Sequence, residues 1–146
     1  MSQAKYSIVV GQSLLVFEGV KPVTVSQYDN FSQPEKMMRK ILPALPCEDE
    51  LNPNFQGMCV IKNRYVLVTG GARRIWDKDI SARTHLLDVE MGDWVIAPRQ
   101  PNLNEPRYWH ASTSTLSAAF VYGGWDANGN NIGTVERLPL NNERDG

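Results

Sequence analysis

Few side chains in this sequence combine the residue type and the spacing that metal binding or catalysis requires. His85 and His110 are the only histidines, and Cys47 and Cys59 are the only cysteines. Two cysteines are too few for a disulfide framework, and their separation of twelve residues matches no common zinc spacing. No acidic residue follows His110 at the spacing of a metal ligand. We therefore expect no metal site, two reduced thiols, and a capping or packing role for His110.

The segment 126–131 has the composition of a calcium-binding loop but not its pattern. With Asp126 at the first loop position, Asn131 stands where a glycine is needed and Arg137 where the bidentate glutamate belongs. Its asparagines and its glycine favour a turn instead. Residues 70–74 lack the lysine and the hydroxyl residue of a phosphate-binding loop, and no nucleophile elbow or kinase signature occurs. The sequence predicts neither an enzyme nor a cofactor.

The composition limits the partners that we expect for the chain. It has 146 residues, of which 42% are apolar and 21% charged, with a formal net charge of −1. These proportions are typical of a soluble globular protein. Because there is no basic excess, neither nucleic acid nor an anionic membrane surface is an expected partner. No apolar stretch approaches the roughly 20 residues that span a bilayer, and no signal-peptide pattern is present. We expect a cytoplasmic protein.

An internal repeat organises the chain. Three apolar segments end in glycine, at residues 15–19, 67–71 and 120–124, and their final glycines are 52 and 53 residues apart. Pro53 and Pro106 each precede the final glycine of a repeat by 18 residues. The repeats differ in length mainly after these glycines, as expected when insertions fall in one loop.

Short apolar runs separated by turn residues predict several β-strands in each repeat. In the second repeat the expected strands cover residues 58–61, 65–69, 84–89 and 94–97. A helical alternative exists at 34–45, where the apolar residues Met37, Met38, Ile41 and Leu45 could line one side of a helix. The repeat places a strand in this segment, and we expect the strand.

The anchor residues resemble those of the kelch family of β-propeller repeats. The matching residues in the second and third repeats are Gly70-Gly71, Leu87-Asp88, Trp94, Arg107 to His110, and Gly123-Gly124. The first repeat is divergent, because it has Glu18-Gly19 for the double glycine, Lys5 for the histidine and Arg39 for the tryptophan. A WD40 repeat is the alternative, but the Trp-Asp pairs at 76–77 and 125–126 lie in the wrong part of the unit.

This resemblance implies an all-β fold of consecutive four-stranded antiparallel propeller blades that form an incomplete propeller. The blades cover residues 1–53, which are divergent, 54–106, and 107–146, which lack the last strand. We expect structural roles at seven repeat positions, with close backbone approach at the glycines and packing between blades at the tryptophan. These positions are Gly19, Gly70, Gly71, Trp94, His110, Gly123 and Gly124.

Propellers have about four to eight blades, so three repeats do not close a ring. We expect the missing blades to come from a longer chain, and self-association of two copies is the alternative. Because function usually lies in loops on a rigid scaffold, we expect a non-catalytic module that binds a partner protein or peptide. A permanent structural component of a large assembly is the second interpretation, and a propeller enzyme is the third.

The expected binding residues lie in the long loops and in the connector between blades. They are Arg73, Arg74, Trp76, Arg83, Arg107, Tyr108 and Trp125. Tryptophan, tyrosine and arginine are the residue types that dominate binding hot spots when they are exposed. The guanidinium groups suit an acidic or phosphorylated peptide.

Overall fold

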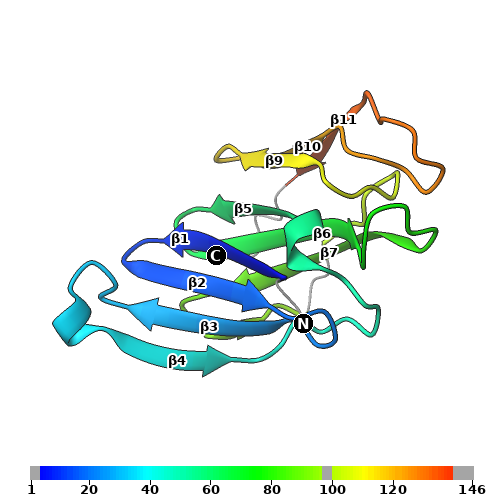
Figure 1. Cartoon of the computed structure of the whole chain (residues 1–146). Helices are drawn as coiled ribbons and strands as arrows, with labels where there is room; N and C mark the ends of the chain where they lie inside the picture. Colours follow the sequence, from blue (N-terminus) through cyan, green and yellow to red (C-terminus); the bar gives the residue numbers. More distant parts are fainter. Residues whose placement is uncertain (1–3, 97–99, 140–146) are drawn as a thin grey trace.

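The computed structural model describes residues 4–96 and 100–139, and this part of the chain consists almost entirely of β-structure. Its strands form three antiparallel sheets, two with four strands and one with three (Figure 1). The helical elements within these residues are two 3-10 turns, η1 (Pro34–Lys36) and η2 (Pro53–Phe55). No helix in the described ranges has the length and apolar character needed to cross a membrane. The expectation of an all-β chain of antiparallel sheets is confirmed.

Sheet 1 contains the first four strands, each hydrogen-bonded to the next in chain order. They are β1 (Lys5–Val10), β2 (Ser13–Glu18), β3 (Thr24–Asp29) and β4 (Met38–Leu42). The segment 34–45 starts with the single turn η1 and continues as β4, which pairs with β3 from Asp29↔Met38 to Val25↔Leu42. The expected strand is therefore confirmed, and helical structure is limited to one turn.

Sheet 2 has the same order. Its strands are β5 (Gly57–Ile61), β6 (Tyr65–Ala72), β7 (Ile80–Asp88) and β8 (Asp93–Trp94). Because β6 continues past the double glycine through a register shift between Thr69 and Gly71, β7 pairs with it from Ile80, earlier than the predicted start at 84. β8 ends at Trp94, although the prediction extended it through Val95 and Ile96. The last predicted residue, Ala97, lies outside the described ranges.

Sheet 3 contains three strands among the described residues. They are β9 (Ala111–Ser114), β10 (Ala118–Tyr122) and β11 (Val135–Pro139), with β10 in the middle. Residues 140–146, which contain the predicted end of the third repeat, lie outside the described ranges. Each of the three sheets falls within one of the three predicted repeats.

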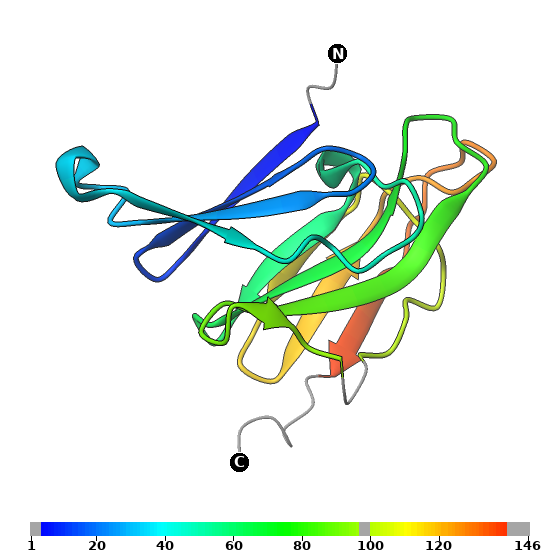
Figure 2. The same cartoon turned by 90° about the horizontal axis from the view of Figure 1, so that it is seen from below.

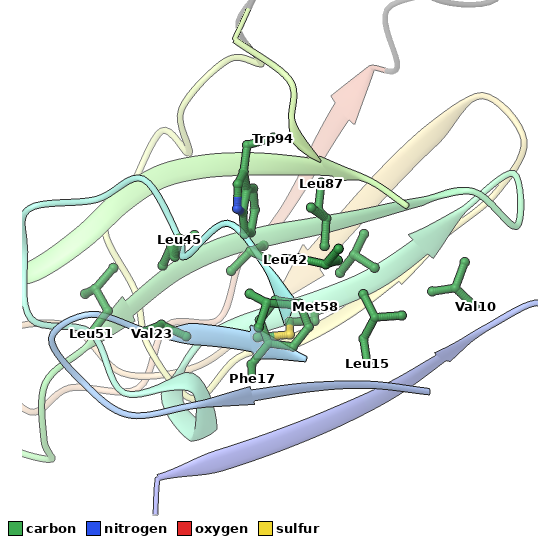
Figure 3. Packing of buried hydrophobic residues seen from close by; sticks show 13 residues of the cluster. Val10, Leu15, Phe17, Val23, Leu42, Leu45, Leu51, Met58, Leu87 and Trp94 are labelled. Carbon is green, nitrogen blue, oxygen red and sulfur yellow. The ribbon is translucent and has the colours of Figure 1, made fainter. Parts of the chain in front are cut away.

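Sheet 2 lies between the other two sheets, and an apolar core fills each of the two interfaces (Figures 1 and 2). Between sheets 1 and 2, Leu15 and Phe17 pack with Met58 and Trp94 (Figure 3). The Trp94 indole N–H donates to the carbonyl oxygen of Pro43 at 2.9 Å, so this tryptophan joins the two sheets by packing and by a hydrogen bond. A second cluster, which includes Leu67 and Val121, fills the space between sheets 2 and 3.

Candidate binding surface

Sheet 2 is joined to sheet 3 by a connector, whose described part before β9 includes residues 100–110. This connector passes between the double glycine of sheet 2 and the double glycine of sheet 3. The Gly71 N–H donates to the Arg107 carbonyl at 2.9 Å. Tyr108 and Trp125 exchange two backbone hydrogen bonds, of 3.2 and 2.9 Å. The connector is thereby tied to the end of β6 on one side and to the segment after β10 on the other.

Two glycines make this passage possible. Gly70 has φ +58°, and a Cβ atom there would lie 2.5 Å from the Arg107 carbonyl oxygen. Gly124 has φ +91°, and its Cβ would lie 2.6 Å from the Tyr108 carbonyl oxygen. Both distances are shorter than a carbon–oxygen contact allows, so only glycine fits. The other predicted glycines, Gly19, Gly71 and Gly123, also have positive φ values.

The close passage buries Arg107 and Tyr108, which we had expected to be exposed partner contacts. The Arg107 side chain is 0% exposed and donates to Glu136 at 2.8 Å and to the Gly123 carbonyl at 3.0 Å. Tyr108 is 2% exposed. The expectation of exposure was wrong for both, because the paired glycines let the sheets close over the connector. Arg107 holds the connector to sheet 3 and does not face solvent.

His110 packs in the same region. Its Nε2 lies 2.8 Å from the Thr69 hydroxyl, and the imidazole occupies space beside Gly57 that a Cβ atom there would fill. Burial, together with the positive charge of Arg107, lowers the pKa of His110 to about 4. The ring is therefore neutral at pH 7, and its role here is to pack between the end of sheet 2 and the start of sheet 3.

Trp76 and Trp125 contact each other, and each forms a hydrogen bond with Tyr108 of the connector. They come from the β6–β7 and β10–β11 loops, which lie side by side at one end of the sheets (Figures 1 and 2). Their rings form an edge-to-face pair with centroids 5.8 Å apart, and Trp76 is 65% exposed. The Trp76 backbone is left-handed, with φ +63°, and its N–H donates to the Tyr108 hydroxyl at 3.1 Å. The fold thus holds a large apolar ring in solvent in a conformation that is unusual for tryptophan.

A second exposed tryptophan follows Tyr108 in the connector. Trp109 is 56% exposed, has φ +60°, and stacks edge-on against Phe55 with centroids 5.3 Å apart. Phe55 also contacts Tyr108, with centroids 6.0 Å apart. We call Phe55, Trp76, Trp109 and Trp125 the aromatic surface, and the buried Tyr108 contacts Phe55 and accepts the hydrogen bond from the Trp76 backbone. Sequence reasoning missed Phe55 and Trp109, although Trp109 lies between two residues that it did select.

The arginines have more varied surroundings than we expected. Arg73 forms ion pairs with Glu50 at 3.3 Å and with Asp77 at 3.5 Å, which partly neutralise its charge. Arg74 is exposed and forms no ion pair with a residue of the described ranges. Arg83 lies on β7 and lines a different pocket, of about 410 Å³, together with Trp94. The structure therefore places Arg73 and Arg74 beside Trp76 on one loop, and it places Arg83 elsewhere.

A polar pocket of about 540 Å³ borders the aromatic surface on the side of sheet 1. It is lined mainly by charged side chains, with more carboxylates than cations: Lys21, Glu48, Asp49, Glu50, Arg73, Asp77, Lys78 and Asp79. Among the residues that the structure describes, no three histidine, cysteine, aspartate or glutamate side chains are placed to hold a metal ion. The neighbourhood of the surface can offer charge and hydrogen bonds to a ligand.

Comparison with known proteins shows a similarity in fold to a solved structure. No protein-family model matches the chain, and no curated protein matches it. Among solved structures, the chain is similar to the structure of YjhT, with a TM-score of 0.71 and 13% sequence identity. The match covers 95% of this chain and 43% of that chain, so this chain spans less than half the length of YjhT. At this identity the likeness concerns the fold alone.

Proposed function

We propose that the chain forms consecutive kelch-type propeller blades and acts as a non-catalytic module that binds a partner protein or peptide through its loops. Three features support the blades: the repeated glycine anchors, the four-stranded order β1 to β4 and β5 to β8, and the stacking of successive sheets. The similarity in fold to a chain more than twice as long is consistent with further blades of the same kind.

The observation that carries the binding function is the exposure of Trp76 on a supported backbone. Exposed tryptophans are costly in water and dominate the energetics of interfaces when a partner covers them. The Trp76 backbone N–H donates to the Tyr108 hydroxyl, and its ring packs against Trp125 and close to Gly129. These contacts order Trp76 before a partner binds. An ordered anchor loses little side-chain entropy when it binds, which favours affinity.

The charged side chains near Trp76 indicate which chemical groups the partner should carry. Arg74 and Lys78 each lie two residues from Trp76 and form no ion pair within the described ranges, whereas Arg73 is held by Glu50 and Asp77. We therefore propose that the partner segment covers the aromatic surface with apolar side chains and places an acidic group near Arg74. The contribution of Arg74 should be smaller than that of Trp76, because an exposed ion pair contributes little free energy.

Selection from a displayed library of random peptides tests the proposal directly. Peptides that are selected on the unmodified protein should bind Trp76→Ala at least about 30-fold more weakly, which corresponds to a hot spot of about 2 kcal/mol. Met91→Ala is the matched control, because Met91 is an apolar side chain with 73% exposure in the turn before β8, away from this surface. If the selected peptides bind both variants equally well, the aromatic surface is not the binding site.

A permanent structural role is the second candidate. Apolar side chains also lie exposed on the two outermost sheet faces, among them Ile41 with 62% exposure on sheet 1 and Val135 with 59% on sheet 3. Such residues on a sheet face are typical of a surface that another protein layer covers. This feature is separate from the aromatic surface, and the two roles can exist in one molecule.

A further inference from the structure

The face of sheet 1 that points away from sheet 2 is partly apolar. Leu15, Phe17 and Leu42 belong to the core shared with sheet 2, so the alternating neighbours Leu14, Val16 and Ile41 point to the other side. Val16 pairs with Ser26, which pairs with Ile41, so these residues form one row across the sheet. No sheet among the described residues covers this face.

Sheet 3 has an uncovered face of the same kind. Ala119, Val121 and Leu138 belong to the core shared with sheet 2, so Phe120, Tyr122 and Val135 point away from it. Tyr122 pairs directly with Val135, and these two side chains are 56% and 59% exposed. The outermost sheets therefore each present several apolar side chains to solvent, beside polar ones such as Arg39 on sheet 1 and Arg137 on sheet 3.

The internal repeat shows that these two faces are complementary. Leu15, Leu67 and Phe120 occupy the same position relative to the glycines. Leu15 packs toward sheet 2 and Leu67 packs toward sheet 3, whereas Phe120 has no following sheet in the described part of the chain. We call the face that carries these three residues the forward face of its sheet.

The residue that follows each of these positions lies on the opposite face of its sheet. Val68 packs toward sheet 1 and Val121 packs toward sheet 2, whereas the equivalent Val16 has no preceding sheet in the described part of the chain. We call this the backward face. Both internal interfaces join a forward face to a backward face. The uncovered forward face of sheet 3 and the uncovered backward face of sheet 1 could therefore form a third interface of the same kind. Within one chain, these two faces lie on opposite sides of the stack (Figure 1).

We propose that a second copy of this chain covers both faces, with sheet 3 of each copy packed on sheet 1 of the other. The contact is heterologous, because two different surfaces meet, and two such contacts close an assembly of two copies. The inference depends on the stacked blades of the proposed function and does not involve the aromatic surface.

Light scattering over a range of concentrations tests this assembly. The full 146-residue chain should have twice the monomer mass of 16.4 kDa. Ile41→Asp on the backward face and Tyr122→Asp on the forward face should each reduce the mass to that of the monomer. Met91→Asp should remain dimeric, because Met91 lies in the turn between β7 and β8 and on neither of the two uncovered faces. Circular dichroism confirms that each variant keeps its β-structure.

Mixing the two monomeric variants gives a sharper test. Ile41→Asp retains an intact forward face and Tyr122→Asp retains an intact backward face. An equimolar mixture should therefore form a complex of one copy of each, joined through the one contact in which neither face is altered. A contact between identical surfaces would not recover in this way. The proposal is overturned if the unmodified chain is monomeric or forms open polymers, or if the mixture stays monomeric. Trp76→Ala should keep the dimer mass, so the failure of peptide binding and the failure of assembly are separate results.

Discussion

At the scale of single residues, the glycines and His110 determine how closely the connector approaches the sheets. Gly70 and Gly124 each face a backbone carbonyl of the connector at a distance that excludes a side chain. His110 fills the adjacent space and contacts Thr69. These residues set the position of Tyr108, whose hydroxyl accepts a hydrogen bond from the Trp76 N–H.

Replacing Gly124 by alanine should destabilise the protein strongly. The new Cβ would sit at φ +91° and 2.6 Å from the Tyr108 carbonyl oxygen, so both backbone strain and a steric clash oppose it. We expect a loss of at least about 2 kcal/mol in the free energy of unfolding. Gly133→Ala is the control, because no atom lies within 4 Å of its Cβ position, and it should change stability by less than about 0.5 kcal/mol. Equal effects in urea unfolding would refute this role for Gly124.

His110 should make the stability depend on pH below neutrality. Its pKa is about 4 in the folded protein because of burial and Arg107, and it returns to about 6.5 in the unfolded chain. The unfolded state therefore binds more protons between these values, and stability falls as the pH drops from about 6.5 to about 4. The loss should approach about 3 kcal/mol at the lower limit.

Urea unfolding of His110→Gln at pH 7 and pH 4.5 measures this contribution. The variant should lose most of the pH dependence, whereas His85→Gln should retain it, because His110 remains in place. A further loss should occur at lower pH, since hydrogen bonds from Ser13 and Gln27 lower the pKa of Asp29 and this stabilisation disappears as the carboxylate is protonated. If His110→Gln has the same pH profile as the unmodified protein, the buried neutral histidine is not the cause.

At the scale of elements, the connector and β11 are joined by a buried ion pair. The Glu136 carboxylate accepts hydrogen bonds from the Arg107 guanidinium and from the backbone N–H groups of Asn104 and Glu105. Arg107 also donates to the Thr134 carbonyl at 3.1 Å. One arginine therefore connects the segment before sheet 3 to the last described strand. A buried pair of this kind fixes a geometry more than it adds stability.

Removing one partner of this pair should be costly. Arg107→Met leaves the Glu136 carboxylate buried without its cation, and we expect a loss of about 3 to 5 kcal/mol. Arg73→Met, which removes a half-exposed cation from Glu50 and from the buried Asp77, should cost less than Arg107→Met, because the Arg73 side chain is 42% exposed. The double variant Arg107→Met with Glu136→Met should recover part of the loss in urea unfolding. A double variant that is less stable than Arg107→Met alone would argue against an unpaired carboxylate as the cause.

The strands could be predicted from the sequence better than the surroundings of the connector. Apolar runs and the glycine anchors located most strands, and the repeat correctly placed β4 where helical spacing competed. The burial of Arg107 and Tyr108 was not predictable from local pattern, because it depends on glycines in two sheets that are separated by more than 50 residues. Trp109 was missed as well, because neither its positive φ nor its exposure can be recognised from the local sequence.

At the scale of the whole molecule, the chain is a stack of sheets that uses the same two faces repeatedly. This stacking brings loops from sheets 2 and 3 to one end, where their tryptophans meet (Figures 1 and 2). The aromatic surface therefore exists only when the two sheets are packed together, because Trp76 and Trp125 come from different sheets and Tyr108 from the segment between them. Binding should consequently be lost whenever packing between sheets 2 and 3 is lost.

The most direct test of this account is to follow the four tryptophan indole N–H signals by NMR while a library-selected peptide is added. Trp76, Trp109 and Trp125 lie on the aromatic surface, whereas Trp94 is buried between sheets 1 and 2 and serves as an internal control. We predict that the signals of the first three tryptophans shift in proportion to bound peptide and that the Trp94 signal stays in place. A peptide that binds without moving the signals of Trp76 and Trp125 would contradict the account.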